Sequence, residues 1–367
     1  MTVRRIEFLH WAKTHSPARY ELTVSGVAHI TPNELDFVGQ VDLERRGAYG
    51  HPDLIDLIAT TYGVAPENVL PTPGTSSANF IALAGALERG QRVLVESPTY
   101  EPLIRVPELL GLEVARFDRI KEEGFRPNVD QVQHELNRGA RAVIMSDLHN
   151  PSGSRCPPDD LKRLSSLCAR HSALLLVDEV YRDFACINCG ARRESAASLG
   201  PHVLTTSSLT KVYGLGGLRA GWILGSPEQI ERAQCVMDHL SVDLPAPTTS
   251  LSIHAFKRLD RLAERTRAIY QHAHPVLSQW LSSRADLTGY GDAGATFAYL
   301  RLPAGTDADA FCQFLREEHD TQIVPGSFFG ASDHIRIGFG VPPEKIADLR
   351  EGLSRVGHAL DQFPART

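Results

Sequence analysis

The sequence lacks the features by which membrane, secreted and nucleic-acid-binding proteins are usually recognised. No apolar run among its 367 residues approaches the ~20 residues of a membrane span, and residues 1–7 lack the apolar core of a signal peptide. The basic residues are scattered and the formal net charge is -6 at pH 7, so nothing indicates a nucleic-acid partner. We therefore expect a soluble, cytoplasmic protein that binds neither membranes nor nucleic acid.

Cysteine is also scarce. The six cysteines have no regular spacing, which suits reduced thiols better than a disulfide framework. Cys186 and Cys189 form a Cys-x-x-Cys pair, but no second pair and no clustered histidines accompany it. We therefore expect no metal site.

What the chain does have is an alternation of short apolar runs with helix-period stretches such as residues 159–171. The runs are typical of buried strands, each with polar or turn residues at its carboxyl end: residues 92–96, 142–146, 174–178 and 203–207. This pattern predicts an α/β fold with a mostly parallel central sheet covered by helices. Ligands in such sheets bind at the carboxyl ends of the strands.

The rest of the chain predicts a second, smaller domain. Residues 246–283 are strongly helical, and an α+β pattern follows: a strand in 295–302, a helix over 307–318, a strand over 334–339 and a final helix over 343–363. We expect residues 1–45 to dock on this small domain, 46–250 to form a large domain that binds the cofactor, 251–285 to form an interdomain helix, and 286–367 to form the small domain.

Lys211 is the most informative of the chain's six lysines. Ser208 precedes it by three residues, and a glycine-rich turn leads from it to Arg219. The other lysines lie among charged or helix-forming neighbours, as solvated lysines do. A neutral lysine amine beside a hydroxyl group and a guanidinium group that can bind a phosphate is what covalently held pyridoxal 5'-phosphate requires.

A helix start rich in small polar residues provides a second candidate anion site. Gly74, Thr75 and Ser76 open a helix that continues through apolar positions to Leu87. Free backbone N–H groups and hydroxyl groups at such a start can bind a phosphate. An ordinary helix N-cap is the alternative interpretation.

Polar and aromatic side chains follow three predicted strands. Asp178 ends one of them and can pair with a protonated pyridine nitrogen, and Tyr181 can donate to the phenolic oxygen of the same ring. Asn150 can donate to that oxygen as well, and Tyr100 can stack on the ring. Taken singly, these residues equally suit a helix cap, a turn and core packing.

Arg336 stands in the otherwise apolar strand 334–339 and suits bidentate recognition of a carboxylate, although a surface strand would show the same pattern. His29 could face a substrate, but a single loop histidine is more often structural.

Taken in order, these motifs resemble the class I/II aminotransferases, the fold type I enzymes that depend on pyridoxal phosphate, from about Ser25 to the C-terminal helix. The resemblance implies that Lys211 forms the Schiff base and Asp178 pairs with the ring nitrogen. It assigns the other cofactor contacts to Tyr181 and Asn150 at the phenolic oxygen, Tyr100 on the ring, and Gly74, Thr75, Ser76, Ser208 and Arg219 at the phosphate.

The same resemblance assigns the substrate α-carboxylate to Arg336 and the lining of the substrate pocket to Gly26 and Val27, with Asn150 also close to the substrate. Tyr49 resembles a tyrosine that reaches the phosphate from the neighbouring subunit, although the stretch after it is shorter than in the family. A homodimer with composite active sites would follow.

The expected reaction is ping-pong transfer of an amino group between an L-amino acid and a 2-oxo acid. A lyase, cyclase or oxidase on the same fold is the alternative, because the region around Ser25 faintly resembles the capreomycidine synthases. A non-catalytic regulator that binds pyridoxal phosphate is a third hypothesis, but no basic recognition helix precedes Ser25.

Overall fold

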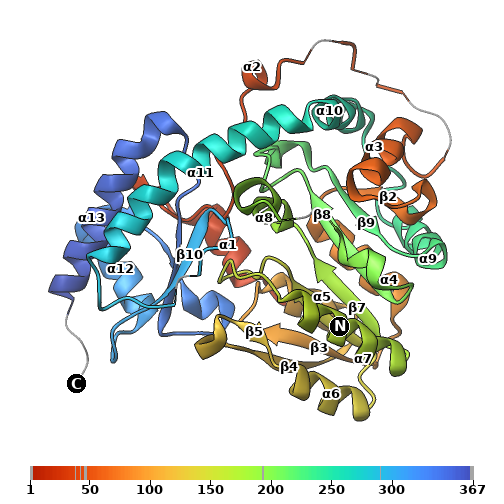
Figure 1. Cartoon of the computed structure of the whole chain (residues 1–367), viewed down its shortest axis with the longest axis horizontal. Coiled ribbons are helices and arrows are strands. Elements are labelled where there is room, and N and C mark those ends of the chain that lie inside the picture. The colour runs from red at the N-terminus through yellow and green to blue at the C-terminus, as the bar shows by residue number, and fades with distance from the viewer. Residues whose placement is uncertain are drawn as a thin grey trace.

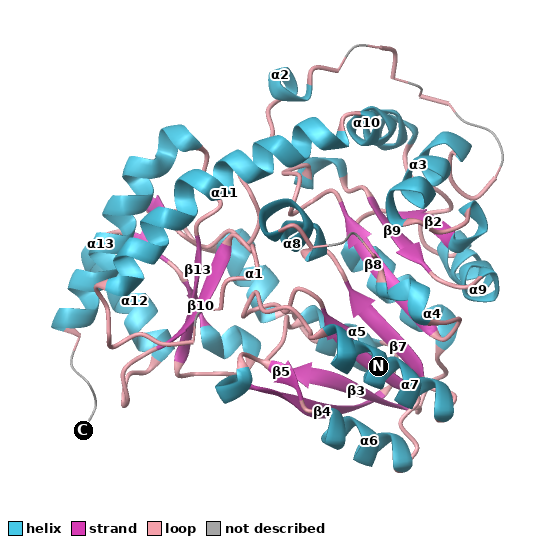
Figure 2. Ribbon diagram, viewed as in Figure 1, coloured by secondary structure: helices cyan, strands magenta, loops and turns pink. Residues whose placement is uncertain are grey.

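The computed structural model describes residues 3–37, 39–41, 43–44, 48–191, 194–289 and 291–363. Its main layer is a twisted sheet of eight strands with helices on both faces, and a second group of strands and helices lies beside it (Figure 1; Figure 2). The long helix α11 (Leu259–Ser282) runs from the first group to the second (Figure 1).

The large sheet has the strand order β2-β9-β8-β7-β6-β3-β4-β5. Its strands are β2 (Val69–Thr72), β3 (Arg92–Ser97), β4 (Glu113–Ile120), β5 (Arg126–Pro127), β6 (Ala142–Ser146), β7 (Leu174–Asp178), β8 (Val203–Ser208) and β9 (Gly221–Leu224). The five strands from β8 to β4 pair in parallel, whereas β9, β2 and β5 are joined by antiparallel pairing. The parallel strands end at one edge, as expected for a sheet whose ligands bind there.

Alternating side chains explain why both faces of this sheet are covered. In β3, Val93 and Val95 point into one apolar cluster, and Leu94 points into another. The first cluster is completed by helices α4 (Thr75–Ala86), α5 (Pro102–Leu109) and α9 (Pro227–Asp238), and the second by α6 (Val129–Asn137) and α7 (Pro158–Arg170).

The second group contains an antiparallel sheet with the order β10-β13-β12, built from β10 (Phe297–Arg301), β12 (Val324–Pro325) and β13 (His334–Gly338). An apolar cluster joins this sheet to α11, α12 (Ala308–His319) and α13 (Ile346–Gln362). Leu22 belongs to the same cluster, and β1 (Tyr20–Glu21) pairs in parallel with β11 (Thr321–Gln322). The segment after the first helix is thus attached to this part of the protein.

The remaining helices are α1 (Glu7–Thr14), α2 (Pro32–Leu35), α3 (Pro52–Tyr62), α8 (Arg182–Cys189) and α10 (Ala246–Lys257). Short 3-10 turns complete the chain: η1 (Pro66–Asn68), η2 (Lys121–Glu123), η3 (Ala196–Leu199), η4 (Gly216–Leu218), η5 (Gly326–Phe329) and η6 (Pro343–Lys345). Within the described ranges, no helix is both long enough and apolar enough to cross a membrane.

The four strands predicted in the large sheet match β3, β6, β7 and β8 to within one residue. The helical stretch predicted over 246–283 is two helices, α10 and α11, because the backbone leaves the helical region at Arg258 (φ -122°, ψ 23°). The division into a docking segment, two domains and an interdomain helix stays a prediction.

Candidate active site

A cavity of about 740 Å³ lies where the carboxyl ends of the parallel strands face the second group of elements. Twelve of the fourteen predicted site residues line it: Gly26, Val27, Thr75, Ser76, Tyr100, Asn150, Asp178, Tyr181, Ser208, Lys211, Arg219 and Arg336. His29 lines it as well. The lining therefore joins predicted residues as far apart in the sequence as Gly26 and Arg336.

Lys211 lies in the loop that follows β8. Surrounding protein lowers the pKa of its amine to about 8, and the positive charges of Arg336 and Arg219 act in the same direction. Asp178 opposes this shift. A large fraction of the amine is therefore neutral near pH 8, as a nucleophilic lysine requires.

Asp178 ends β7 and is 4% exposed. Asn79 Nδ2 donates to its Oδ2 at 2.9 Å, and the backbone N–H of Val180 donates to its Oδ1 at 3.1 Å. Burial nevertheless raises the pKa of this carboxyl group to about 6. A cation placed next to it would offset that burial, so the site suits a protonated ring nitrogen.

Sequence analysis did not identify Asn79 as a site residue. It lies one helical turn beyond Thr75 in α4, and its Oδ1 accepts a 2.6 Å hydrogen bond from Thr206 Oγ1 in β8. The i, i+4 spacing from Thr75 was the available signal, because it places the two side chains on one face of the helix.

The start of α4 fits a phosphate. Thr75 Oγ1 is buried and has no hydrogen-bond partner among the described residues. Gly74 has φ 83° and does not itself line the cavity; a Cβ there would lie 2.6 Å from Arg219 Nη2. Because Gly74 has no side chain, there is room for the Arg219 guanidinium group beside the first N–H groups of the helix. An anion bound there can accept hydrogen bonds from both.

Arg336, in β13, is 1% exposed and has the rings of three phenylalanines around it. Its Cζ lies 4.9 Å, 5.4 Å and 5.8 Å from the ring centroids of Phe329, Phe8 and Phe297. Its Nη1 donates to Asn150 Oδ1 at 2.9 Å, and its Nε has no hydrogen-bond partner within the described structure. An anion would complete this site, because a buried guanidinium group without a counter-charge is costly.

The turn that carries Asn150 rests on a buried ion pair between Arg119 and Glu96. Arg119 Nε donates to Glu96 Oε2 at 2.8 Å. Ser146 Oγ donates to Glu96 Oε1 at 2.6 Å and accepts from the Asn150 N–H at 3.1 Å. The charged pair thus fixes the backbone from which Asn150 reaches the cavity.

Tyr181 and Tyr100 line the cavity, and each contacts another side chain of the protein. The Tyr181 hydroxyl group is 2.7 Å from Ser25 Oγ. The Tyr100 ring packs edge-on against Phe8 with centroids 5.9 Å apart. The contacts predicted for the two tyrosines with a cofactor stay predictions.

Helix α1 supplies part of the cavity wall, which sequence analysis did not foresee. Ile6, Phe8, Leu9, Trp11 and Ala12 line the cavity. The Phe8 N–H donates to Glu101 Oε2 at 2.9 Å, which attaches the helix to α5. The sequence offered only a weak signal, a short run of apolar residues near the N-terminus.

Tyr49 lies outside this cavity. The residue is 40% exposed, and its hydroxyl group donates to Asp238 Oδ2 at 2.7 Å. The predicted contact of Tyr49 concerns the site of a neighbouring subunit, so it stays a prediction.

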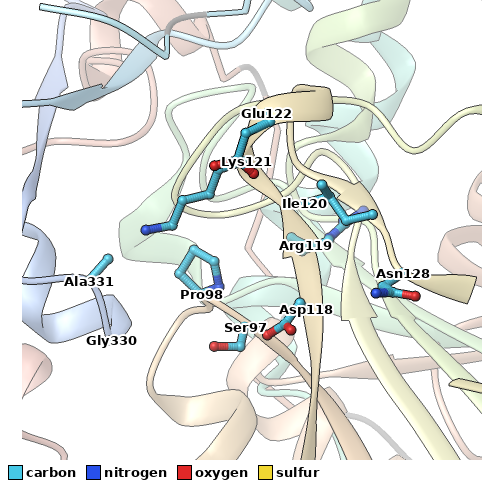
Figure 3. A pocket seen from close by; sticks show the side chains of 10 residues that line it. All are labelled: Ser97, Pro98, Asp118, Arg119, Ile120, Lys121, Glu122, Asn128, Gly330 and Ala331. Carbon is cyan, nitrogen blue, oxygen red and sulfur yellow. The ribbon is translucent and has the colours of Figure 1, made fainter. Parts of the chain in front are cut away.

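A second cavity of about 380 Å³ lies between the ends of β3 and β4 and the loop at Gly330. Figure 3 shows its lining residues, with the Lys121 side chain extended across the space. Lys121 Nζ lies 3.6 Å from Asp333 Oδ1, so an ion pair links the two walls. None of the predicted site residues lines this cavity.

Comparisons with known proteins agree with this geometry. The sequence model of the family "Aminotransferase class I and II" matches residues 34–353. The chain is 28% identical over 356 residues to a capreomycidine synthase from Streptomyces vinaceus, covering 94% of this chain and 90% of that protein. It is 28% identical over 326 residues to a valine–pyruvate aminotransferase from Mycobacterium tuberculosis, covering 85% and 82%. A solved aminotransferase dependent on pyridoxal phosphate, from Streptococcus suis, superposes with a TM-score of 0.91 at 23% identity, covering 100% of both chains.

The fold and the family match define an enzyme that depends on pyridoxal phosphate. The chain belongs to the class I and II aminotransferases, and pyridoxal 5'-phosphate is its cofactor.

Proposed function

We propose that the enzyme transfers an amino group between an L-amino acid with an uncharged side chain and a 2-oxo acid, in a ping-pong cycle. The observation that carries the proposal is that one cavity brings together the Lys211 amine, the Asp178 carboxylate and the Arg336 guanidinium group. The Lys211 amine can lose its proton, and the Asp178 carboxylate is buried. The Arg336 guanidinium group is buried as well, and its Nε has no hydrogen-bond partner within the described structure.

Each side chain has a distinct role in this proposal. Bound pyridoxal phosphate supplies an aldehyde and an electron-withdrawing ring that stabilises negative charge at the substrate Cα. Lys211 Nζ would hold the cofactor through its aldehyde and would serve as the base that takes the proton from the substrate Cα. The Asp178 carboxylate keeps the ring nitrogen protonated. Arg336 holds the α-carboxylate through Nε and its remaining N–H groups.

Thr75, Ser76, Ser208 and Arg219 are proposed to hold the phosphate. Support comes from the unpartnered hydroxyl group of Thr75 and from the room that Gly74 leaves for Arg219. Tyr181 and Asn150 are proposed to donate to the phenolic oxygen. The Asn150 carbonyl oxygen already accepts from Arg336, which leaves the amide nitrogen as a donor.

The charges of the cavity disfavour a cationic substrate side chain, and its apolar walls favour an uncharged one. Asp178 is the one carboxylate among the described lining residues, whereas Lys13, Arg219 and Arg336 are cationic. A substrate guanidinium or ammonium group would therefore enter without a carboxylate to pair with, at a cost in desolvation. Apolar walls from α1 and α5, including Leu9, Ala12, Leu103 and Val106, suit an apolar side chain instead.

The second candidate is a cyclase or lyase of amino-acid-derived substrates. It is supported by the similarity to a capreomycidine synthase over 94% of the chain. Incubation of the holoenzyme with single amino acids separates the two functions. Formation of a 2-oxo acid and pyridoxamine phosphate supports transamination, whereas ammonia or a cyclic product without pyridoxamine phosphate supports the alternative.

We also propose a homodimer in which Tyr49 reaches the phosphate of the neighbouring site. Tyr49 is exposed and bonded to Asp238 at the end of α9. The next residues along the chain include Leu240 and Val242, which are 54% and 68% exposed. Exposed apolar residues beside Tyr49 suit a subunit interface.

A further inference from the structure

Residues 23–27, which we call the strap, cross between the two groups of elements. On one side, the Gly338 N–H at the end of β13 donates to Leu22 O at 2.8 Å, and the Ala28 N–H donates to Gly340 O at 2.7 Å. These bonds flank the strap at both ends and attach it to the segment that continues the strand of Arg336.

On its other side, the strap contacts the loop of the reactive lysine. The Val27 N–H donates to Lys211 O at 3.0 Å. A Cβ on Gly26 would lie 2.7 Å from the same carbonyl oxygen, so the contact requires glycine at this position. Arg336 Nη2 also donates to Thr23 O at 3.2 Å. Three groups of the proposed chemistry therefore meet this one segment: Arg336, Lys211 and, through Ser25, Tyr181.

Ser25 projects from the middle of the strap to Tyr181. The two hydroxyl oxygens are 2.7 Å apart, and the residues are only 4% and 3% exposed. Either hydroxyl group can be the donor. A tyrosine hydroxyl group has one proton, however, so it cannot donate to Ser25 and to a cofactor at once.

This single proton decides the direction of the bond in the holoenzyme. If Tyr181 donates to the phenolic oxygen of the cofactor, Ser25 must donate to the Tyr181 oxygen. Hydrogen bonds in such a chain polarise one another, so donation from Ser25 strengthens donation from Tyr181. We propose that Ser25 is a positioning residue which, through Tyr181, lowers the proton affinity of the linkage between Lys211 and the cofactor.

The direction of the effect follows from charge. The phenolic oxygen carries negative charge when the linkage is unprotonated, and a donor to that oxygen stabilises this form. A weaker hydrogen bond from Tyr181 to that oxygen therefore raises the proton affinity of the linkage. Burial raises the pKa of Tyr181 itself, and Arg336 and the Ser25 hydroxyl group oppose that rise. The other ionisable groups that line the cavity are Asp178, Tyr100, Lys211, Arg219, Lys13, His15 and His29.

The inference rests on the proposed contact of Tyr181 with the cofactor, and the test separates the two. The visible absorption of the bound cofactor is titrated with pH in the wild-type holoenzyme and in Ser25→Ala, Ser25→Thr, Tyr181→Phe and the double variant Ser25→Ala/Tyr181→Phe. We expect Tyr181→Phe to raise the midpoint, Ser25→Ala to raise it by about half a pH unit, equal to about a threefold change in proton affinity, and Ser25→Thr to leave it near the wild-type value.

The double variant should titrate like Tyr181→Phe alone, because Ser25 acts through the tyrosine. An unchanged midpoint in Ser25→Ala, with a shifted one in Tyr181→Phe, would overturn the role of Ser25 and leave the proposed function intact. A Ser25→Ala shift that persists in the Tyr181→Phe background would overturn it too. An unchanged midpoint in Tyr181→Phe would refute the tyrosine contact and, with it, the role of Ser25. Near-ultraviolet circular dichroism of each variant checks that the fold is kept.

Discussion

Asn79 Nδ2 donates a 2.9 Å hydrogen bond to Asp178 Oδ2 across 99 residues of sequence. The same asparagine accepts from Thr206 Oγ1 at 2.6 Å, so its amide group is held at both ends. Asp178 therefore has a fixed orientation before any cofactor binds, and the helix start that is proposed to hold the phosphate also orients the carboxylate.

Replacement of Asn79 should weaken cofactor binding. In Asn79→Ala the Asp178 carboxylate loses a buried donor, and we expect the dissociation constant of pyridoxal phosphate to rise about tenfold, equal to ~1.4 kcal/mol. Fluorescence titration of the apoenzyme measures it. Asn68→Ala is the control, because Asn68 Nδ2 donates to Gly225 O rather than to a site residue. Equal affinities in Asn79→Ala and wild type would contradict the role.

The attachment of pyridoxal phosphate to the apoenzyme should depend on pH with a midpoint near the Lys211 pKa of about 8, and not near the ordinary value of 10.5. The neutral amine is the nucleophile, so the rate constant should rise with pH and level off above the midpoint. Stopped-flow absorbance measures it. Asp178 raises this pKa, so Asp178→Asn should move the midpoint downward. A midpoint near 10.5 would show that Lys211 is not desolvated.

Arg336→Lys should impair recognition of the α-carboxylate. Lysine cannot reproduce a planar fork of donors, and we expect kcat/KM to fall by about 30- to 100-fold, equal to ~2–3 kcal/mol. Steady-state kinetics with an apolar amino acid measures the loss. Arg301→Lys is the matched control on the neighbouring strand, because the Arg301 side chain is 61% exposed and pairs with Asp333. Similar losses of kcat/KM in Arg336→Lys and Arg301→Lys would argue against a substrate contact for Arg336.

Arg119→Met should destabilise the apoenzyme by about 3–5 kcal/mol, because Glu96 would remain buried without its cation. Urea unfolding followed by circular dichroism measures the change. Burial raises the pKa of Glu96 even with Arg119 present, so the neutral double variant Glu96→Gln/Arg119→Met should recover part of the loss. A double variant less stable than Arg119→Met would contradict this account.

Mixed dimers test the proposed contact of Tyr49. Tyr49→Phe homodimers should bind the cofactor about tenfold more weakly, through loss of a hydrogen bond to the phosphate. A dimer of one Lys211→Ala and one Tyr49→Phe subunit should contain one site with both native residues. That site should bind the cofactor with wild-type affinity, as measured after reduction with borohydride. If it binds as weakly as the Tyr49→Phe homodimer, Tyr49 does not act across the interface.

The sequence was sufficient to predict four strands of the large sheet, β3, β6, β7 and β8, and the residues that follow them, because these buried strands are largely apolar and their polar ends stand out. Asp178 and Lys211 could be located this way. The wall formed by α1 could not, because Phe8 packs against Tyr100 and Phe328, far away along the chain. The bond between Ser25 and Tyr181 could not be predicted either, since it depends on the path of the strap and not on a local pattern.

The strap is attached to Lys211 and Arg336 through main-chain atoms, and this has a consequence for protein engineering. Side chains at Thr23 and Val24 can be randomised in a library aimed at substrate range, because neither is buried in the core and the bond from Arg336 uses the main-chain oxygen of Thr23. Glycine should be kept at positions 338 and 340, where a Cβ would lie 1.9 Å from Val24 O and 2.2 Å from Gly26 O. Substrate specificity can thus be varied along the strap while its backbone contacts with the Lys211 loop and with the segment after β13 are kept.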